Sequence, residues 1–208
     1  MQEIYIARTV GYASNCYMLV SDGQGAVIDP SVPISAFRLP DNVRVTKVLL
    51  THGHFDHILA IDSYVKDGAE VFVSEYDAYM LKDAMANASA VFGLDPIVSV
   101  AIPNVLKDGD VIEHGSAHIK VMATPGHTEG SVCYISDNVM FSGDTLFAEG
   151  IGRCDLIGGD YYTMQVTLSK IAKLDVDYKV YPGHGELTTL NKEIKYNYEL
   201  SRFNAQNI

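Results

Sequence analysis

Residues 48–57 are Val48-Leu49-Leu50, an apolar run typical of a buried strand, followed directly by Thr51-His52-Gly53-His54-Phe55-Asp56-His57. The chain has only seven histidines, and three of them fall in this H-x-H-x-D-H motif. With the His and Asp content of this chain, chance would produce such a motif about once in a thousand cases. Imidazole and carboxylate groups are ligands for zinc, iron and manganese. The motif therefore predicts a metal site at the end of a strand, rather than a polar loop with surface histidines.

The density of ligand groups in the motif indicates two neighbouring ions. Four ligand-type side chains in six residues are too many for one tetrahedral ion. On an extended or looping backbone His52 and His54 point to one side. Asp56 and His57, where the chain turns into a helix, point to an adjacent position. Each ion would then need further ligands from distant parts of the chain.

Three such candidates follow apolar strands elsewhere. His127 and His184 each lie in a Pro-Gly-His turn, where small residues let the backbone approach an ion. Asp144 ends the strand that contains Phe141-Ser142-Gly143. It is either an ordinary turn residue or a carboxylate that bridges two cations about 3.5 Å apart, and the five histidines favour the bridge. His114 and His118 lack this setting and are expected on a solvated face.

The remaining sequence predicts a β-rich chain with helices after hairpins. No repeat, low-complexity tract or long linker divides residues 1–208, so a single domain is expected. A β-rich chain with helices after hairpins favours two sheets packed face to face with helices on the outside, rather than a doubly wound sheet. Strands are predicted at residues 3–8, 16–20, 26–29, 47–50, 70–74 and 178–181, with two more within 110–123 and a hairpin over 131–142; helices are predicted at 58–68, 75–90, 161–174 and 190–203.

Composition narrows the class of protein. With 15 basic and 26 acidic side chains the formal charge is −11, which argues against nucleic acid or an anionic membrane as partner. No apolar run reaches the roughly 18 residues of a membrane span, and the first residues lack signal-peptide features. A soluble, cytoplasmic protein is expected. The three cysteines form no CxxC pair, so no disulfide framework is expected, and Cys16 and Cys133 are predicted to be buried thiols.

The motifs T-H-G-H-F-D-H, P-G-H-T, S-G-D-T and P-G-H-G occur in the order typical of the metallo-beta-lactamase superfamily, which the chain resembles. Residues 143–147 and the Gly152-Arg153-Cys154-Asp155-Leu156 segment are similar to its glyoxalase II-like branch, in particular to the short hydroxyacylglutathione hydrolase-like proteins. The resemblance implies an α/β (α+β) fold, the αββα sandwich of two mixed sheets. It also implies two divalent ions, zinc first and iron or manganese as alternatives. One ion would be held by His52, His54 and His127, the other by Asp56, His57 and His184, with Asp144 bridging them.

The resemblance further implies a metal-dependent hydrolase. Two cations that share a water lower its pKa toward about 7, and the resulting hydroxide would attack the carbonyl of a thioester or related ester, for which S-D-lactoylglutathione is the implied substrate. Asp56 and Asp144 are the candidate catalytic groups. Asp144 would bridge the two ions, and Asp56 would also orient the hydroxide. Lactamases with a cysteine ligand would have Cys at position 144, so antibiotic hydrolysis is not expected. No G-x-S-x-G motif supports a serine nucleophile.

Several alternatives stay open at this point. Arg153 is a candidate for binding a substrate carboxylate, or it forms a structural pair with Asp155. Asp29 either supports a ligand loop from behind or is a plain turn residue. A mononuclear Fe(II) persulfide dioxygenase, a related family, would use His52, His127 and Asp144 alone. A non-catalytic metal-binding module is the third possibility.

Overall fold

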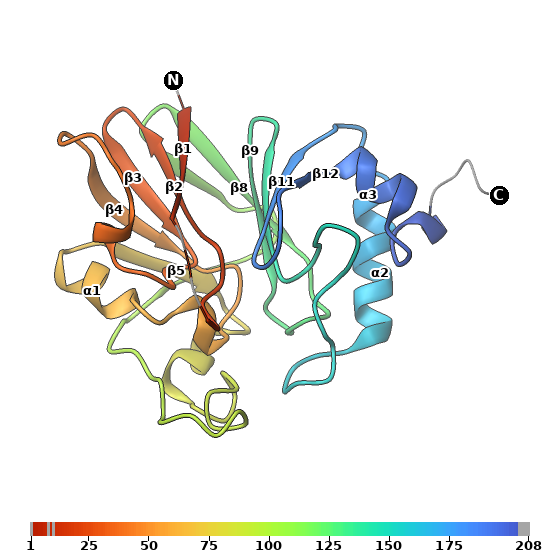
Figure 1. Cartoon of the computed structure of the whole chain (residues 1–208), viewed down its shortest axis with the longest axis horizontal. Helices are drawn as coiled ribbons and strands as arrows, with labels where there is room; N and C mark the ends of the chain where they lie inside the picture. Colours follow the sequence, from red (N-terminus) through yellow and green to blue (C-terminus); the bar gives the residue numbers. More distant parts are fainter. Residues whose placement is uncertain (1, 8, 10, 204–208) are drawn as a thin grey trace.

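The computed structural model describes residues 2–7, 9 and 11–203, and these form two six-stranded sheets packed face to face (Figure 1). In the first sheet the strands follow chain order, antiparallel from β1 to β3 and parallel from β3 to β6. Its members are β1 (Gln2–Ala7), β2 (Cys16–Ser21), β3 (Gln24–Ile28), β4 (Arg44–Leu49), β5 (Glu70–Ser74) and β6 (Asn104–Leu106).

The second sheet has the order β12-β11-β10-β9-β8-β7 and is antiparallel except for the β10–β11 pair. Its members are β7 (Val111–His114), β8 (Ala117–Ala123), β9 (Val132–Ser136), β10 (Val139–Gly143), β11 (Lys179–Pro182) and β12 (Thr188–Thr189). Figure 1 shows α1 (Ile61–Lys66) outside the first sheet, and α2 (Tyr161–Ile171) and α3 (Leu190–Tyr196) outside the second. The expected αββα sandwich is confirmed.

Alternating side chains explain the four layers. In β2, Tyr17 and Leu19 face the core between the sheets, where Phe141 of the second sheet also packs. The intervening Met18 faces the opposite way and joins the cluster that contains Tyr64 of α1. This period of two is what an extended strand produces, so a strand with apolar residues on both faces is buried between two layers. A third cluster packs α2 and α3 against the second sheet.

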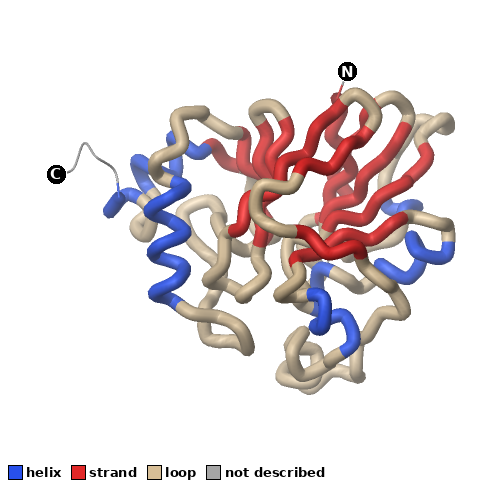
Figure 2. Tube along the Cα trace, turned by 180° about the vertical axis from the view of Figure 1, so that it is seen from behind, coloured by secondary structure: helices blue, strands red, loops and turns tan. Residues whose placement is uncertain are grey.

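The strand directions place five strand ends on one edge of the sandwich. β3 and β4 are parallel, as are β10 and β11. β8 runs parallel to β10 because two successive antiparallel pairings restore the direction. Within each sheet the segments that follow these strands therefore start from one edge, and the two edges lie together, since the backbone of Val132 donates a hydrogen bond to the carbonyl oxygen of Thr51; the long tan loops gather there in Figure 2. The predicted ligands all lie in these segments.

One predicted helix is wrong. Residues 75–90 contain only a 3-10 helix, Ala78–Lys82, followed by turns. The side chain of Asp83 accepts hydrogen bonds from the backbone of Met85 and Ala86, and that of Asn87 accepts one from Ser89. Such local bonds compete with the helical ladder, which explains why apolar spacing alone misled.

The ends of other predicted elements also differ. The helix predicted from residue 58 begins at Ile61, after the 3-10 turn Phe55–His57. The closing helix α3 stops at Tyr196, because Asn197 turns extended and its side chain bonds the backbone of Phe147 and Gly150; a 3-10 turn, Ser201–Phe203, follows. The strand predicted at 3–8 spans Gln2–Ala7, and position 8 lies outside the described residues.

The expectation for His114 is wrong, whereas that for His118 is confirmed. His114 is fully buried, and its Nε2 lies 3.1 Å from the carbonyl oxygen of Leu19. β7 alternates outward and inward, and His114 takes an inward position. His118 is exposed, and its Nδ1 lies 2.8 Å from Oε2 of Glu113.

Cys16 and Cys133 are buried free thiols, as predicted. Burial raises the pKa of Cys16 to about 12 and that of Cys133 to about 11. Among the described helices, none has the length and apolar character that a bilayer crossing requires.

Candidate metal centre

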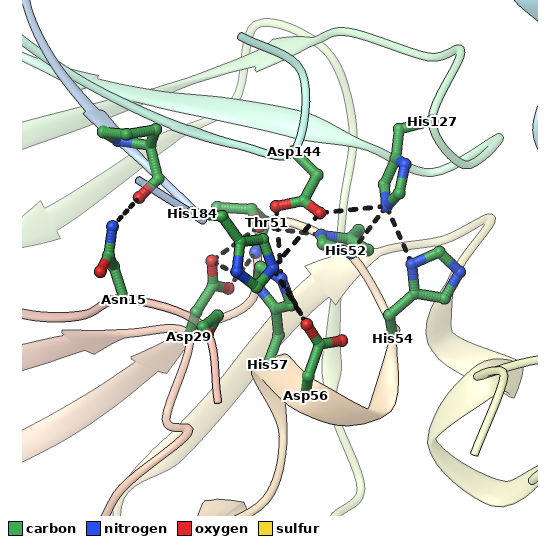
Figure 3. A network of polar contacts seen from close by, with 12 residues as sticks. Asn15, Asp29, Thr51, His52, His54, Asp56, His57, His127, Asp144 and His184 are labelled. Carbon is green, nitrogen blue, oxygen red and sulfur yellow. Dashed lines mark hydrogen bonds and ion pairs between the residues drawn. The ribbon is translucent and has the colours of Figure 1, made fainter. Parts of the chain in front are cut away.

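Seven side chains meet at the edge where the strands end (Figure 3). The loop after β4 carries four of them, and the turns after β8, β10 and β11 carry one each. Since β4 belongs to the first sheet and the other three strands to the second, the cluster spans both sheets. The seven are the predicted ligands His52, His54, Asp56, His57, His127, Asp144 and His184.

The first group consists of His52, His54 and His127, all buried. Nε2 of His127 lies 2.9 Å from Nδ1 of His54 and 3.2 Å from Nε2 of His52. Two nitrogens bound to one tetrahedral zinc at about 2.05 Å would be about 3.3 Å apart. The nitrogen of His127 is thus close to the spacing from each of the other two that a single ion would need.

The second group consists of Asp56, His57 and His184. Oδ2 of Asp56 lies 3.0 Å from Nε2 of His184 and 3.6 Å from Nε2 of His57. His184 is the most exposed of the seven, at 39% of its side chain, and Asp56 is 16% exposed. This group therefore opens toward solvent, while the first is enclosed.

Asp144 lies between the two groups. Its Oδ2 is 3.5 Å from Nε2 of His127 and 3.6 Å from Nε2 of His184, and its Oδ1 is 3.4 Å from Nε2 of His57. A Cβ atom at Gly183 would overlap Oδ1 of Asp144 and lie 2.8 Å from Cε1 of His57. The glycine of this Pro-Gly-His turn thus leaves the space that the carboxylate occupies.

The residues fit divalent cations. Oδ1 of Asp144 and Nε2 of His57 are buried, and neither has a hydrogen-bond partner among the described residues. A buried carboxylate oxygen without a donor is costly, and a cation bound there would satisfy it. Five imidazoles and two carboxylates match the ligand preferences of zinc, iron and manganese.

Protonation favours the ligating forms at most of these positions. Burial holds the pKa of His52 well below its ordinary value and lowers that of His54 to about 3, so both stay neutral. Burial raises the pKa of Asp144, but the neighbouring imidazoles, His57 first, lower it further than burial raises it. For His57, burial lowers the pKa, and the charges of Asp56 and Asp29 raise it above the ordinary value. This excess of negative charge favours a cation beside His57.

Partners behind the site fix the orientation of three imidazoles. Nδ1 of His57 lies 2.9 Å from Oδ2 of Asp29, which also accepts a hydrogen bond from the Thr51 hydroxyl. Nδ1 of His52 lies 3.1 Å from the same hydroxyl. Nδ1 of His127 donates to the carbonyl oxygen of Arg153 at 2.6 Å. In each case Nε2 is left to face the site, which is how outer partners orient metal-ligating histidines.

Asp29 therefore sits behind the site, the first of its two predicted alternatives. Thr51 was not predicted, because its role depends on contacts across the sheet. The turn that carries His184 is held by Asn15, whose side chain donates to the carbonyl oxygens of Pro182 and Gly185, each at 3.0 Å. Figure 3 shows Asp29 and Thr51 behind the ligand groups, and Asn15 beside the turn that carries His184.

Arg153 forms the structural pair with Asp155 that was one of its two predicted roles. Its Nε and Nη2 donate to the two oxygens of Asp155 at 2.6 and 2.8 Å. The guanidinium also lies 5.9 Å from the centre of the Phe92 ring. This side chain is about half exposed and lines the pocket over the ligand groups, so it is accessible to a substrate. That it binds a substrate carboxylate stays a prediction.

A pocket of about 390 Å³ opens over the metal-ligand candidates. Its walls are largely apolar and come from four loops, two of which no motif identified in advance. Exposed aromatic residues such as Tyr12 and Phe92 were the available signal, yet single exposed aromatics are common on protein surfaces. The apolar lining residues are Tyr12, Phe55, Ala88, Phe92, Phe147 and Leu156.

Comparison with known proteins is consistent with this geometry. A family model described as the metallo-beta-lactamase superfamily matches residues 9–184. The chain is 34% identical to the probable metallo-hydrolase YqgX of Bacillus subtilis, covering 91% of this chain and 93% of the relative. It is 30% identical to the hydroxyacylglutathione hydrolase GloC of Haemophilus influenzae, covering 94% and 96%.

Two solved structures are also similar to the chain. BLEG-1, described as a B3 metallo-beta-lactamase, superposes with a TM-score of 0.87 at 30% identity, covering 96% of this chain and all of the other. TTHA1623, solved in a di-iron-bound form, superposes with a TM-score of 0.81 at 28% identity, covering 92% and 98%.

Proposed function

Because the family model spans residues 9–184, the chain belongs to the metallo-beta-lactamase superfamily, and on this premise we propose that it is a binuclear metal-dependent hydrolase of thioesters. The proposed substrate class is a hydroxyacyl thioester, S-D-lactoylglutathione or a similar compound. The observation that carries the proposal is the position of Asp144, within 3.6 Å of imidazoles from both ligand groups.

The proposal assigns the seven side chains to two ions. His52, His54 and His127 would hold the first ion, and Asp56, His57 and His184 the second, with Asp144 shared. When bound, two such cations acidify a water molecule to hydroxide near neutral pH and act as Lewis acids toward a carbonyl oxygen. Zinc is the first choice, while iron and manganese suit the same ligands. The di-iron form of TTHA1623 supports including iron.

Asp56 is the group best placed to orient the attacking oxygen. It is both a member of the second ligand group and part of the pocket lining. Burial raises its pKa, but the charges of His57 and the hydrogen bond from His184 lower it below the ordinary value. Asp56 is therefore ionised at neutral pH and can accept a hydrogen bond from a water in the pocket. Its carboxylate would then fix the direction of attack.

The pocket supports a thioester more than a substrate with a poor leaving group. A thiol has a pKa near 8.5 and departs as a thiolate, so no side chain needs to protonate it. The apolar walls would exclude bulk water from the reacting carbonyl. Among the described lining residues, Arg153 is the one Arg or Lys, and it already pairs with Asp155. The similarity to GloC supports the glutathione thioester as the first compound to test.

Two other functions make different predictions. A mononuclear Fe(II) persulfide dioxygenase would need only His52, His127 and Asp144. The complete group of Asp56, His57 and His184 instead supports two ions. The similarity to BLEG-1 makes a β-lactam a necessary member of any substrate panel, although position 144 is Asp rather than the Cys of lactamases with a cysteine ligand.

The test is turnover of a defined panel by protein of measured metal content. The panel contains S-D-lactoylglutathione, simpler acyl thioesters, a lactone, a β-lactam and glutathione persulfide with oxygen monitored. We expect thioester hydrolysis that rises with loading of two ions per chain and stops after chelation. Oxygen consumption with persulfide at one iron per chain would instead establish the dioxygenase. Metal binding without turnover of any compound would leave a binding module.

A further inference from the structure

Asp77 is a buried carboxylate outside both ligand groups. It follows β5 and precedes the 3-10 helix Ala78–Lys82, and only 1% of it is exposed. Both of its oxygens accept hydrogen bonds. Oδ2 accepts from the backbone of Gly53 at 3.0 Å and from the Thr128 hydroxyl at 2.7 Å, and Oδ1 accepts from the backbone of Gly130 at 2.9 Å.

These three donors lie on the two loops that supply the first ligand group. Gly53 stands between His52 and His54, on the loop after β4 of the first sheet. Thr128 follows His127 directly, on the loop that connects β8 to β9 of the second sheet. The carboxylate of Asp77 therefore joins the two loops behind the imidazoles whose nitrogens meet at 2.9 and 3.2 Å.

The close fit depends on residues without side chains. A Cβ atom at Gly130 would overlap the carboxylate of Asp77. A Cβ atom at Gly53 would lie 2.6 Å from Cβ of Met80. Both backbone donors can reach Asp77 because these positions are glycine.

The contacts of Asp77 are all neutral donors. Taking a carboxylate out of water is costly, and burial raises its pKa although the three donors lower it. A buried polar group whose hydrogen bonds are satisfied rigidifies its surroundings and specifies one geometry. The second ligand group, Asp56, His57 and His184, has no contact with Asp77 among those of the described residues.

We infer that Asp77 is a positioning residue that sets the spacing between the His52–His54 loop and His127, and so controls binding of the first ion but not the second. This inference rests on the proposed metal centre, but it does not depend on which substrate is hydrolysed. Asp77 belongs to neither ligand group and does not line the pocket, so it would act through the two loops.

The test measures each ion separately. In a His184→Gln background only the first group keeps all its histidines, and in a His54→Gln background only the second does. Asp77→Asn is introduced into both, because Asn keeps the shape but cannot accept hydrogen bonds through its amide nitrogen. The dissociation constant for Co²⁺ is measured by competition with a chromophoric chelator, together with the thermal midpoint of the metal-free protein.

A second pair of variants isolates the hydroxyl. Thr128→Val removes the hydroxyl's bonds to Asp77 and to Ser131 while keeping the size of the side chain, and Thr128→Ser keeps both. Asp62→Asn serves as the charge control, because Asp62 accepts hydrogen bonds from Ser99 and Val100 away from the site. These variants keep the inference testable if Asp77→Asn fails to fold.

We expect Asp77→Asn to weaken Co²⁺ binding to the first group by about 10- to 100-fold, as loss of an outer partner does at other sites. Binding to the second group should change less than about 3-fold. Thr128→Val should follow Asp77→Asn in direction, whereas Thr128→Ser and Asp62→Asn should bind like their parent. Unchanged binding to the first group, or equal weakening of both groups, would overturn the inference.

These outcomes are separate from those for the proposed function. Parent proteins that bind Co²⁺ but hydrolyse no thioester would contradict the hydrolase and leave the role of Asp77 to be decided by the binding data. Parent proteins that bind no Co²⁺ would refute the metal centre and this inference together.

Discussion

Replacing Gly183 by alanine should disable the site without disturbing the fold. The added Cβ would overlap Oδ1 of Asp144 and lie 2.8 Å from Cε1 of His57, whereas ordinary contact begins at 3.4 Å. His57 would have to move by about 0.6 Å, and Asp144 by more. The backbone of Gly183 is not in the left-handed region, so alanine adds no conformational strain there.

The expected loss follows from this displacement. A misplacement of about 1 Å costs about 100-fold in rate, which corresponds to about 2.7 kcal/mol of transition-state stabilisation. We therefore expect kcat/KM for thioester hydrolysis to fall by at least about 100-fold, together with reduced metal content. The assay is thioester turnover with metal content measured on the same preparation.

Gly150→Ala is the matched control, because a Cβ atom there meets nothing within 4 Å although the residue lies on a loop next to the pocket. It should retain activity within about 2-fold. A Gly183→Ala protein with full activity and two ions per chain would refute the geometry described for Asp144. A control that loses as much activity would show that any side chain on these loops is disruptive.

Three further predictions concern single residues. Asp144→Ala should abolish hydrolysis and release bound metal, measured by elemental analysis; full activity would refute the shared role. Asp29→Asn should weaken binding of the second ion by about 10- to 100-fold, because it supports His57, and chelator competition on the His54→Gln background would detect this; unchanged affinity would show that Asp29 is only a turn residue. Burial lowers the pKa of His114 in the folded chain, more than its bond to Leu19 raises it. The unfolded chain therefore takes up the proton first, and stability falls as the pH drops below about 6.5. Urea midpoints at pH 7.5 and pH 5 should show a smaller loss for His114→Gln than for the parent, and equal losses would contradict this.

The sequence predicts most strongly where the signal is local. An apolar run followed by a dense ligand motif identifies both a strand and its terminal loop, and an apolar run also precedes the turns of His127, Asp144 and His184. The β-rich order of the chain, with helices after hairpins, favoured the two packed sheets. These signals need no knowledge of which strands are neighbours.

The remaining features depend on contacts between distant segments. His114 is buried because β7 turns its side chain toward β2, and nothing near it in the sequence shows this. Asp77 lay within a predicted helix, and its partners are 24 to 53 residues away. The apolar pocket walls are drawn from separate loops, so they become visible only when the strands are placed.

The two sheets correspond to the two halves of the chain, since β1–β6 form one and β7–β12 the other. Neither half alone contains a complete ligand group: the first supplies His52, His54, Asp56 and His57, and the second supplies His127, Asp144 and His184. If the backbone were severed between Leu106 and Val111, each fragment would carry an unfinished set of donors. Uptake of an ion would then report that the fragments had reunited, which makes the chain a candidate for a split-protein sensor.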